Sequence, residues 1–280
     1  MWSLPNRRTV CTHSTARRAN GDGNSAPGPA GQPETIYSLP CVHNDLVFIG
    51  DRSGYLHCLN LETGLTIWKQ EMANSVNATA TVFEELVITA TNAGNVQAFA
   101  KRDGRRVWKR GLDGPSSRQL FLVNGHLVAT ADSLYYLDPL TGKIRHRARW
   151  RGQKVGSAAA VGDRIALFLS ISAKGLSHEA CKSKCKAHSE TSHSETLLLL
   201  EEGATVREIE CSKYRHDVRF SSTTGLLYAS GLAGFDILDP ETGVRLYSSA
   251  MNACGVPEVT RETIFTLDNK GTVSAMAHPY

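Results

Sequence analysis

The 280-residue sequence has no run of 18 consecutive apolar residues, which argues against a transmembrane helix. It also has no apolar segment behind its first arginines, so no secretory signal peptide is visible. No two of the seven cysteines are adjacent, and no spacing between them repeats, so they do not indicate a disulfide framework. We therefore interpret Cys41 and Cys58, which fall in predicted strands, as small buried apolar residues.

Residues 1–33 differ in composition from everything after them. Gly21–Pro33 is rich in Gly, Pro, Ser and Asn and cannot bury enough apolar surface to fold, so we expect a disordered linker. Residues 1–20 contain four arginines and no acidic residue. That composition fits an organelle transit segment or a disordered basic tail, and the sequence leaves the compartment open.

A short motif returns throughout residues 34–280. In its first copy, Tyr55–Leu61 has the composition of a strand, Gly64 ends a tight turn, and a second strand follows through Trp68. The turn glycines stand at 64, 104, 142, 203 and 243, in steps of 40, 38, 61 and 40 residues. A period near 40 residues without helical periodicity is typical of the four-stranded blades of a β-propeller.

The repeats predict an all-β propeller with five recognisable blades and a partial sixth. The step of 61 residues contains one period and a polar insertion at 172–195. The second repeat shows the expected blade most clearly, with strands predicted at Ser75–Val82, Leu86–Thr91, Asn95–Ala100 and Arg105–Arg110.

The sixth repeat offers three strands before the sequence ends. We predict them at Cys254–Val259, Thr263–Leu267 and Thr272–Ala277. The edge of this blade is then either left open or completed by Arg7–His13 from the N-terminal segment.

The turns carry a family resemblance. Asp138–Gly142 and Asp239–Gly243 read D-x-x-T-G, and the first copy has Asn60 in place of the aspartate. A strand followed by D-x-x-T-G-x-x-x-W resembles the pyrroloquinoline-quinone-like, or quinoprotein-type, β-propeller repeat. That family includes quinoprotein dehydrogenases and the propeller lipoprotein of outer-membrane barrel assembly. The resemblance implies that blades dock on one another through Trp68, Trp108, Gly64, Gly104, Gly142 and Gly243.

The enzymes of this family use adjacent cysteines near the cofactor, a calcium ion and an aspartate base. No such cysteine pair occurs here, and the docking role accounts for Trp68 and Trp108 without a cofactor. We therefore expect a non-catalytic scaffold that binds protein or peptide partners, with no cofactor. The alternative is a relative or fragment of a quinoprotein-type sugar or alcohol dehydrogenase.

The insertion at 172–195 concentrates histidine and cysteine among serines and lysines. Histidine nitrogen and thiolate sulfur bind zinc, and Cys181, Cys185 and His188 are the weak candidates for a metal site. The segment lacks the ligand spacing of a zinc finger. We therefore assign no metal and favour a solvated loop.

Basic residues cluster in the middle of the chain. Residues 101–154 contain 13 Lys or Arg and 4 Asp, a charge of +9, so the other residues sum to −5 within the total of +4. Strict alternation over Lys143–Arg151 predicts five cations on one face of a strand. A solvated edge whose charges prevent strand pairing is the interpretation that we favour. The alternative is an anionic partner, and an acidic protein fits better than nucleic acid, because aromatic residues do not interleave with the cations. The predicted basic surface consists of Arg105, Lys109, Lys143, Arg145, Arg147, Arg149 and Arg151.

Overall fold

The strands of the computed structural model fall into two units, Met1–Gly111 and Leu112–Tyr280, and each is described by itself. The structure describes residues 36, 38–116, 120–151, 153–171, 196–211, 215–231, 234–250, 257–267 and 272–279. Within these ranges there is no helix, and hence none long and apolar enough to cross a membrane. The predicted disordered segment at 1–33 and the insertion at 172–195 lie outside them, so both stay predictions.

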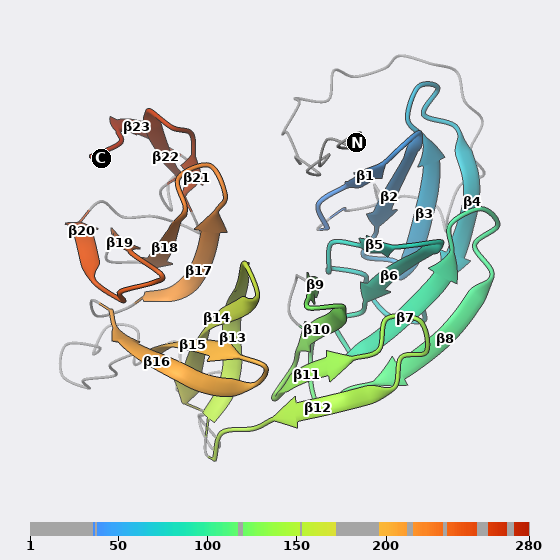
Figure 1. The fold of residues 1–280 in the computed structure, drawn as a ribbon. Coiled ribbons are helices and arrows are strands. Elements are labelled where there is room, and N and C mark those ends of the chain that lie inside the picture. The colour runs from blue at the N-terminus through green and yellow to red at the C-terminus, as the bar shows by residue number, and fades with distance from the viewer. Residues whose placement is uncertain are drawn as a thin grey trace, which may run out of the picture. The chain divides into compact units, whose positions relative to one another are not determined.

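The first unit consists of two four-stranded antiparallel sheets that lie side by side (Figure 1). In each sheet the strands pair in chain order with their neighbours. Sheet 1 contains β1 (Cys41–His43), β2 (Leu46–Gly50), β3 (Tyr55–Asn60) and β4 (Thr66–Glu71), and sheet 2 contains β5 (Thr81–Phe83), β6 (Leu86–Ala90), β7 (Asn95–Ala100) and β8 (Arg106–Gly111).

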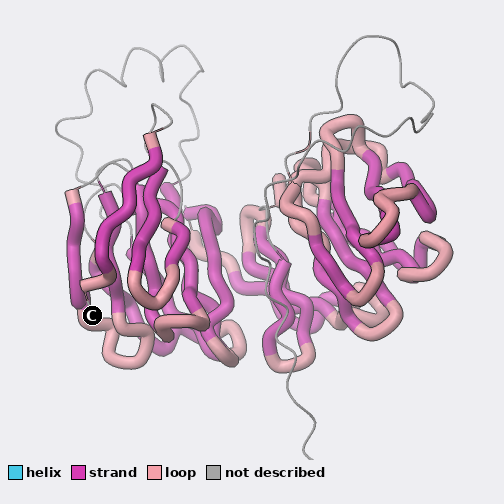
Figure 2. Tube along the Cα trace, turned by 90° about the horizontal axis from the view of Figure 1, so that it is seen from above, coloured by secondary structure: helices cyan, strands magenta, loops and turns pink. Residues whose placement is uncertain are grey.

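The second unit continues the same meander. Seen from above, the strands of each sheet run alongside one another, with turns at both ends (Figure 2). Sheet 3 contains β9 (Leu120–Val123), β10 (His126–Thr130), β11 (Leu134–Leu137) and β12 (Ile144–Ala148). Sheet 4 contains β13 (Gln153–Val161), β14 (Arg164–Ile171), β15 (Thr196–Glu201) and β16 (Ala204–Glu210), and sheet 5 contains β17 (Arg215–Ser221), β18 (Leu226–Gly231), β19 (Gly234–Leu238) and β20 (Arg245–Ser249).

The sixth sheet has three strands in the part of the chain that is described: β21 (Glu258–Val259), β22 (Thr263–Leu267) and β23 (Val273–Ala277). The second and third strands match the sequence expectation closely. Of the expected first strand, Cys254–Val259, only the last two residues form β21, and residues before 257 are outside the described ranges. Arg7–His13 also lies outside them, so its role as a fourth strand remains a prediction.

The D-x-x-T-G turn forms because its aspartate bonds to the backbone that follows it. Asp138 Oδ1 accepts hydrogen bonds of 3.0 Å from the backbone N–H groups of Leu140 and Thr141. The N–H of Gly142 then donates to the carbonyl of Asp138 at 2.8 Å, and the glycine takes a φ of +65°. Asp239 makes the same bonds, and Asn60 substitutes for aspartate because its side-chain oxygen accepts in the same way.

The apolar cores lie between consecutive sheets. In the first unit, Phe48 and Leu56 from sheet 1 pack with Val87 and Phe99 from sheet 2. Sheets 3 and 4, 4 and 5, and 5 and 6 each share a similar cluster in the second unit. Each sheet therefore depends on its neighbour to bury its apolar faces.

The predicted first strand of the second repeat, Ser75–Val82, is wrong in its extent. Only Thr81–Phe83 pairs as β5, and the segment before it is irregular. The cause is tertiary: the N–H of Val76 donates to the carbonyl of Asp51, and the carbonyl of Ser75 accepts from Asn92. These bonds hold the segment between two turns, so its backbone groups do not join a sheet ladder.

Trp68, on the outer strand of sheet 1, lies against the turn of sheet 2. Its indole Nε1 donates a 2.8 Å hydrogen bond to the carbonyl of Lys101. The ring also covers Gly104 so closely that a Cβ at this glycine would lie 2.7 Å from the indole. Trp68 stands four residues after Gly64, and we call this contact, between that position and the turn glycine of the next sheet, the joint.

The joint recurs in the second unit with other side chains. A Cβ at Gly203 would lie 2.6 Å from the His146 ring, and one at Gly243 would lie 2.7 Å from Arg207 Cδ. Arg207 Nη1 also donates to the carbonyl of Thr242 at 2.7 Å, as the indole of Trp68 does to Lys101. His146 and Arg207 each follow a turn glycine by four residues.

We predict that Trp68→Ala lowers the free energy of unfolding by about 3–5 kcal/mol, the usual cost of truncating a buried tryptophan. Trp68 is 8% exposed and packs at a tilt on Phe48 and Phe99. Urea unfolding followed by circular dichroism measures the change. Ile67→Ala is the matched control, because that neighbour is 47% exposed and should cost much less. A loss below about 1 kcal/mol for Trp68→Ala would contradict the docking role.

Candidate interaction surface

β12 is an edge strand of sheet 3, and the basic residues on and around it fall into two classes. Arg145 and Arg147 are paired with acidic side chains of their own unit. Arg145 Nη2 lies 2.5 Å from Asp138 Oδ2 in the preceding turn, and Arg147 Nη2 lies 2.5 Å from Asp113 Oδ2. The charges of these two arginines are therefore compensated within the unit, which the sequence pattern did not predict.

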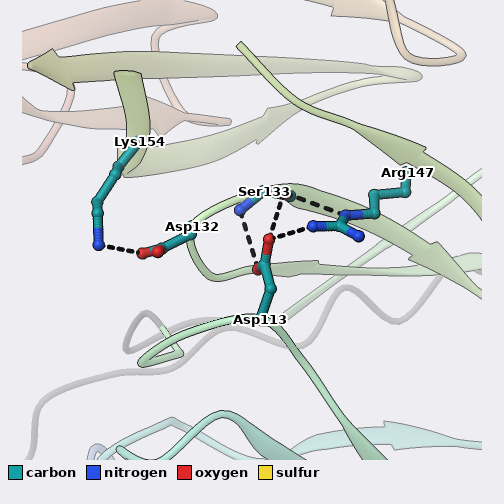
Figure 3. Close-up of polar contacts among 5 residues, drawn as sticks. All are labelled: Asp113, Asp132, Ser133, Arg147 and Lys154. Carbon is teal, nitrogen blue, oxygen red and sulfur yellow. Dashed lines mark hydrogen bonds and ion pairs between the residues drawn. The ribbon is translucent and has the colours of Figure 1, made fainter. Parts of the chain in front are cut away.

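Arg147 belongs to a polar network at the β10–β11 turn (Figure 3). Ser133 Oγ donates to Asp113 Oδ2 at 2.6 Å, and Arg147 Nε donates to the same Ser133 oxygen at 3.2 Å. The backbone N–H of Ser133 donates to Asp113 Oδ1 at 3.2 Å. The guanidinium also lies over the Tyr135 ring, 5.3 Å from its centroid. These contacts fix the orientation of Arg147. The Ser133 hydroxyl both donates and accepts a hydrogen bond in this network, so it is not available as a nucleophile.

The environment of Asp113 shifts its pKa. Partial burial alone would raise the pKa of this carboxyl, but hydrogen bonds from Ser133, Arg147 and Tyr135 outweigh it and hold the pKa below its usual range. Burial raises the pKa of Tyr135, and the neighbouring Asp113 charge raises it further. Asp113 is therefore ionised and Tyr135 neutral at neutral pH.

A second ion pair lies beside this network. Lys154 Nζ, at the start of β13, lies 2.7 Å from Asp132 Oδ1 in the β10–β11 turn (Figure 3). The side chains are 41% and 29% exposed, so the pair adds little to stability. A Cβ at Gly114 would lie 2.7 Å from Asp132 Oδ1, so a larger residue there would shift this carboxylate.

Lys143, Arg149 and Arg151 make up the second class. All three are exposed, and none has a side-chain hydrogen bond or ion pair within the described ranges. The predicted alternation over Lys143–Arg151 is wrong beyond Ala148, where β12 ends. The chain turns there because the N–H of Gln153 donates to the carbonyl of Trp150. We call these three residues the unpaired cations.

Arg105 and Lys109 lie on the outer hairpin of sheet 2, in the other unit. Both are exposed, and neither has a side-chain ion pair in the described part of the chain. Because each unit is described by itself, their continuity with the β12 cations stays a prediction.

The metal and cysteine expectations are only partly covered by the structure. No three His, Cys, Asp or Glu residues come together to hold a metal ion among the residues that are described. Cys181, Cys185 and His188 lie outside those residues. Cys41 and Cys58 are buried, and burial raises the pKa of the Cys58 thiol to about 11, so it stays protonated.

Sequence reasoning missed the acidic partners. Asp113 lies 34 residues before Arg147, and nothing in the local pattern joins the two. The aspartate of the D-x-x-T-G turn was a usable signal, because Asp138 precedes Arg145 across one hairpin. Arg145 and the turn N–H groups lower the pKa of Asp138 to about 2.

We predict that Arg147→Gln raises the pKa of Asp113 towards the ordinary aspartate value of about 3.9, because one charged donor is lost. A carboxyl with a lowered folded-state pKa stabilises the fold above its unfolded pKa and loses this effect as the pH falls. The stability difference between wild type and variant should thus be fully present at neutral pH and shrink below about pH 4.

Carbon-detected NMR titration of the Asp113 carboxyl and urea unfolding across this pH range measure both effects. Arg149→Gln serves as the control, because Arg149 is one of the unpaired cations and should leave Asp113 unchanged. An unchanged Asp113 pKa in Arg147→Gln would show that the ion pair does not set it.

Sequence comparisons show which known proteins this chain is similar to. A sequence profile for the family described as "Outer membrane protein assembly factor BamB" matches residues 18–171. Proteins of that description from Legionella pneumophila and Shewanella oneidensis are each 26% identical, over 45% and 31% of this chain. The matches span only 38% and 23% of the lengths of those two relatives.

Solved structures show the same fold. The crystal structure of BamB from Moraxella catarrhalis covers 88% of this chain and 84% of its own, with a TM-score of 0.56 and 15% identity. The computationally designed protein Ika8 covers 88% of this chain and 72% of its own, with a TM-score of 0.65 and 12% identity. The predicted all-β propeller class is confirmed.

Proposed function

The chain belongs to the family described as outer membrane protein assembly factor BamB, and from this premise we propose that it is a non-catalytic propeller scaffold that binds a protein partner. The relatives are named as assembly factors for outer membrane proteins, and a factor of this kind acts on other proteins. Repeat propellers present many loops and outer strands around a rigid core, which suits binding.

The observation that carries the proposal is the set of unpaired cations, Lys143, Arg149 and Arg151. Two neighbouring arginines are neutralised by Asp138 and Asp113, whereas these three are exposed and have no ion pair in the described ranges. Exposed charges of one sign attract a partner of the opposite sign and steer its approach. We therefore assign the partner an acidic segment.

An acidic peptide tests this proposal on the full chain. A fluorescent Glu-rich peptide should bind, and Arg149→Gln with Arg151→Gln should weaken its binding about tenfold. That factor equals about 1.4 kcal/mol, which two ion pairs at an exposed surface can supply. Affinity should also fall as salt rises.

The matched control keeps the charge. Arg149→Lys with Arg151→Lys should bind the peptide nearly as well as wild type, since the proposal requires cations and no fixed fork geometry. Equal affinity in the glutamine variant would identify the cations as a solvated edge that prevents strand pairing. Tighter binding of a single-stranded oligonucleotide than of the peptide would also overturn the proposal.

A further inference from the structure

The joint of sheet 3 departs from the repeat at three matched positions. In sheets 1 and 2 the tryptophan four residues after the turn glycine pairs across the ladder with a small residue, Cys58 or Ala98. In sheet 3, His146 pairs with Tyr136 instead. Cys58, Ala98 and Tyr136 each also pair with a residue of the second strand of their sheet. Two positions before that residue stands a leucine in sheets 1 and 2 and a histidine in sheet 3. The sets are Leu46, Cys58 and Trp68 in sheet 1, Leu86, Ala98 and Trp108 in sheet 2, and His126, Tyr136 and His146 in sheet 3.

In sheet 3 the Tyr136 ring contacts both histidine rings. The rings of His126 and Tyr136 are nearly perpendicular with centroids 6.3 Å apart, and Tyr136 lies tilted to His146 at 5.9 Å. Tyr136 is 5% exposed, so it is the floor of this cluster. Burial raises the pKa of the Tyr136 hydroxyl, which is therefore neutral.

A cavity of about 300 Å³ opens beside these rings. Its rim includes Asp163 from the β13–β14 turn, Glu202 from the β15–β16 turn, and Arg145. An imidazole is smaller than an indole, so His146 leaves volume that a tryptophan at this joint would fill. A cavity of this size suits a small group.

The charge of the rim is acidic. Arg145 is paired with Asp138, so its charge is compensated. Asp163 and Glu202 have neither a hydrogen bond nor an ion pair from a side chain in the described part of the chain. Arg164, which follows Asp163, pairs with Glu201 and Glu241. Two exposed carboxylates thus face a cavity with an aromatic floor.

We propose that this cavity binds a guanidinium group, as an arginine side chain of a peptide or small ligand presents it. A guanidinium pairs with carboxylates through several N–H donors, and its planar face stacks on aromatic rings. An anionic ligand would face Asp163 and Glu202 without a free cation to offset them. The site is separate from the unpaired cations, so it does not rest on the proposed function.

Titration of the full chain with N-acetyl-arginine methylamide, followed by ¹H–¹⁵N NMR, tests the site. Resonances of His126, His146 and the two turns should shift and saturate at about millimolar ligand, the range for one side chain. Asp163→Asn with Glu202→Gln should weaken binding at least tenfold. N-acetyl-lysine methylamide should bind more weakly, because its ammonium does not stack, and the acetylglutamate analogue should not bind.

Two further variants separate the site from general effects of charge and folding. Glu85→Gln with Asp103→Asn changes the carboxylates at the matching turn positions of sheet 2 and should leave binding unchanged. In that sheet Glu85 pairs with Lys101 and Arg102. His146→Trp restores the side chain of the repeat and should abolish binding by filling the cavity. If His146→Trp does not fold, the variant Asp163→Asn with Glu202→Gln still tests the proposal, because both of its positions are exposed. Equal binding by Asp163→Asn with Glu202→Gln, or by the glutamate analogue, would overturn the proposal.

Discussion

One contact organises each unit of this protein: the side chain four residues after a turn glycine lies on the turn glycine of the next sheet. Trp68 on Gly104 makes it with an indole and a hydrogen bond to a backbone carbonyl. The contact needs a glycine, because a Cβ on the facing turn would enter the ring. Trp68 also belongs to the apolar core between sheets 1 and 2, so this joint helps to close that core.

Variation at the joint gives the repeats their separate chemistry. Arg207 keeps the hydrogen bond to the next turn without an aromatic ring, whereas His146 keeps the ring and leaves a cavity beside it. At the joint of sheet 3 a polar imidazole thus replaces the tightly packed indole, and such departures from a repeat are expected at functional sites. Sheet 3 supplies the rings of the guanidinium cavity, sheet 4 supplies its carboxylates, and the unpaired cations flank β12 of sheet 3. The cavity and the cations have opposite charge preferences.

Local patterns made the meander and the turns predictable from sequence. The D-x-x-T-G turn is held by bonds within five residues, so Asp138 and Asp239 indicate it directly. Ser75–Val82 failed because Val76 bonds to a turn of sheet 1, and the alternation beyond Ala148 failed because the chain turns at Trp150. The Asp113–Arg147 pair and the ring cluster join residues through strand register, which no local pattern shows.

The most direct measurement of this account compares Gly104→Ala with Gly64→Ala. Both glycines have positive φ, +71° and +69°, so both variants strain the backbone alike, but only Gly104 faces an indole. Urea unfolding should show Gly104→Ala to be the more costly by about 1–3 kcal/mol, the range for overpacking a filled site. In a Trp68→Ala background the difference should vanish. Equal costs in the wild-type background, or a difference that persists without Trp68, would contradict the joint.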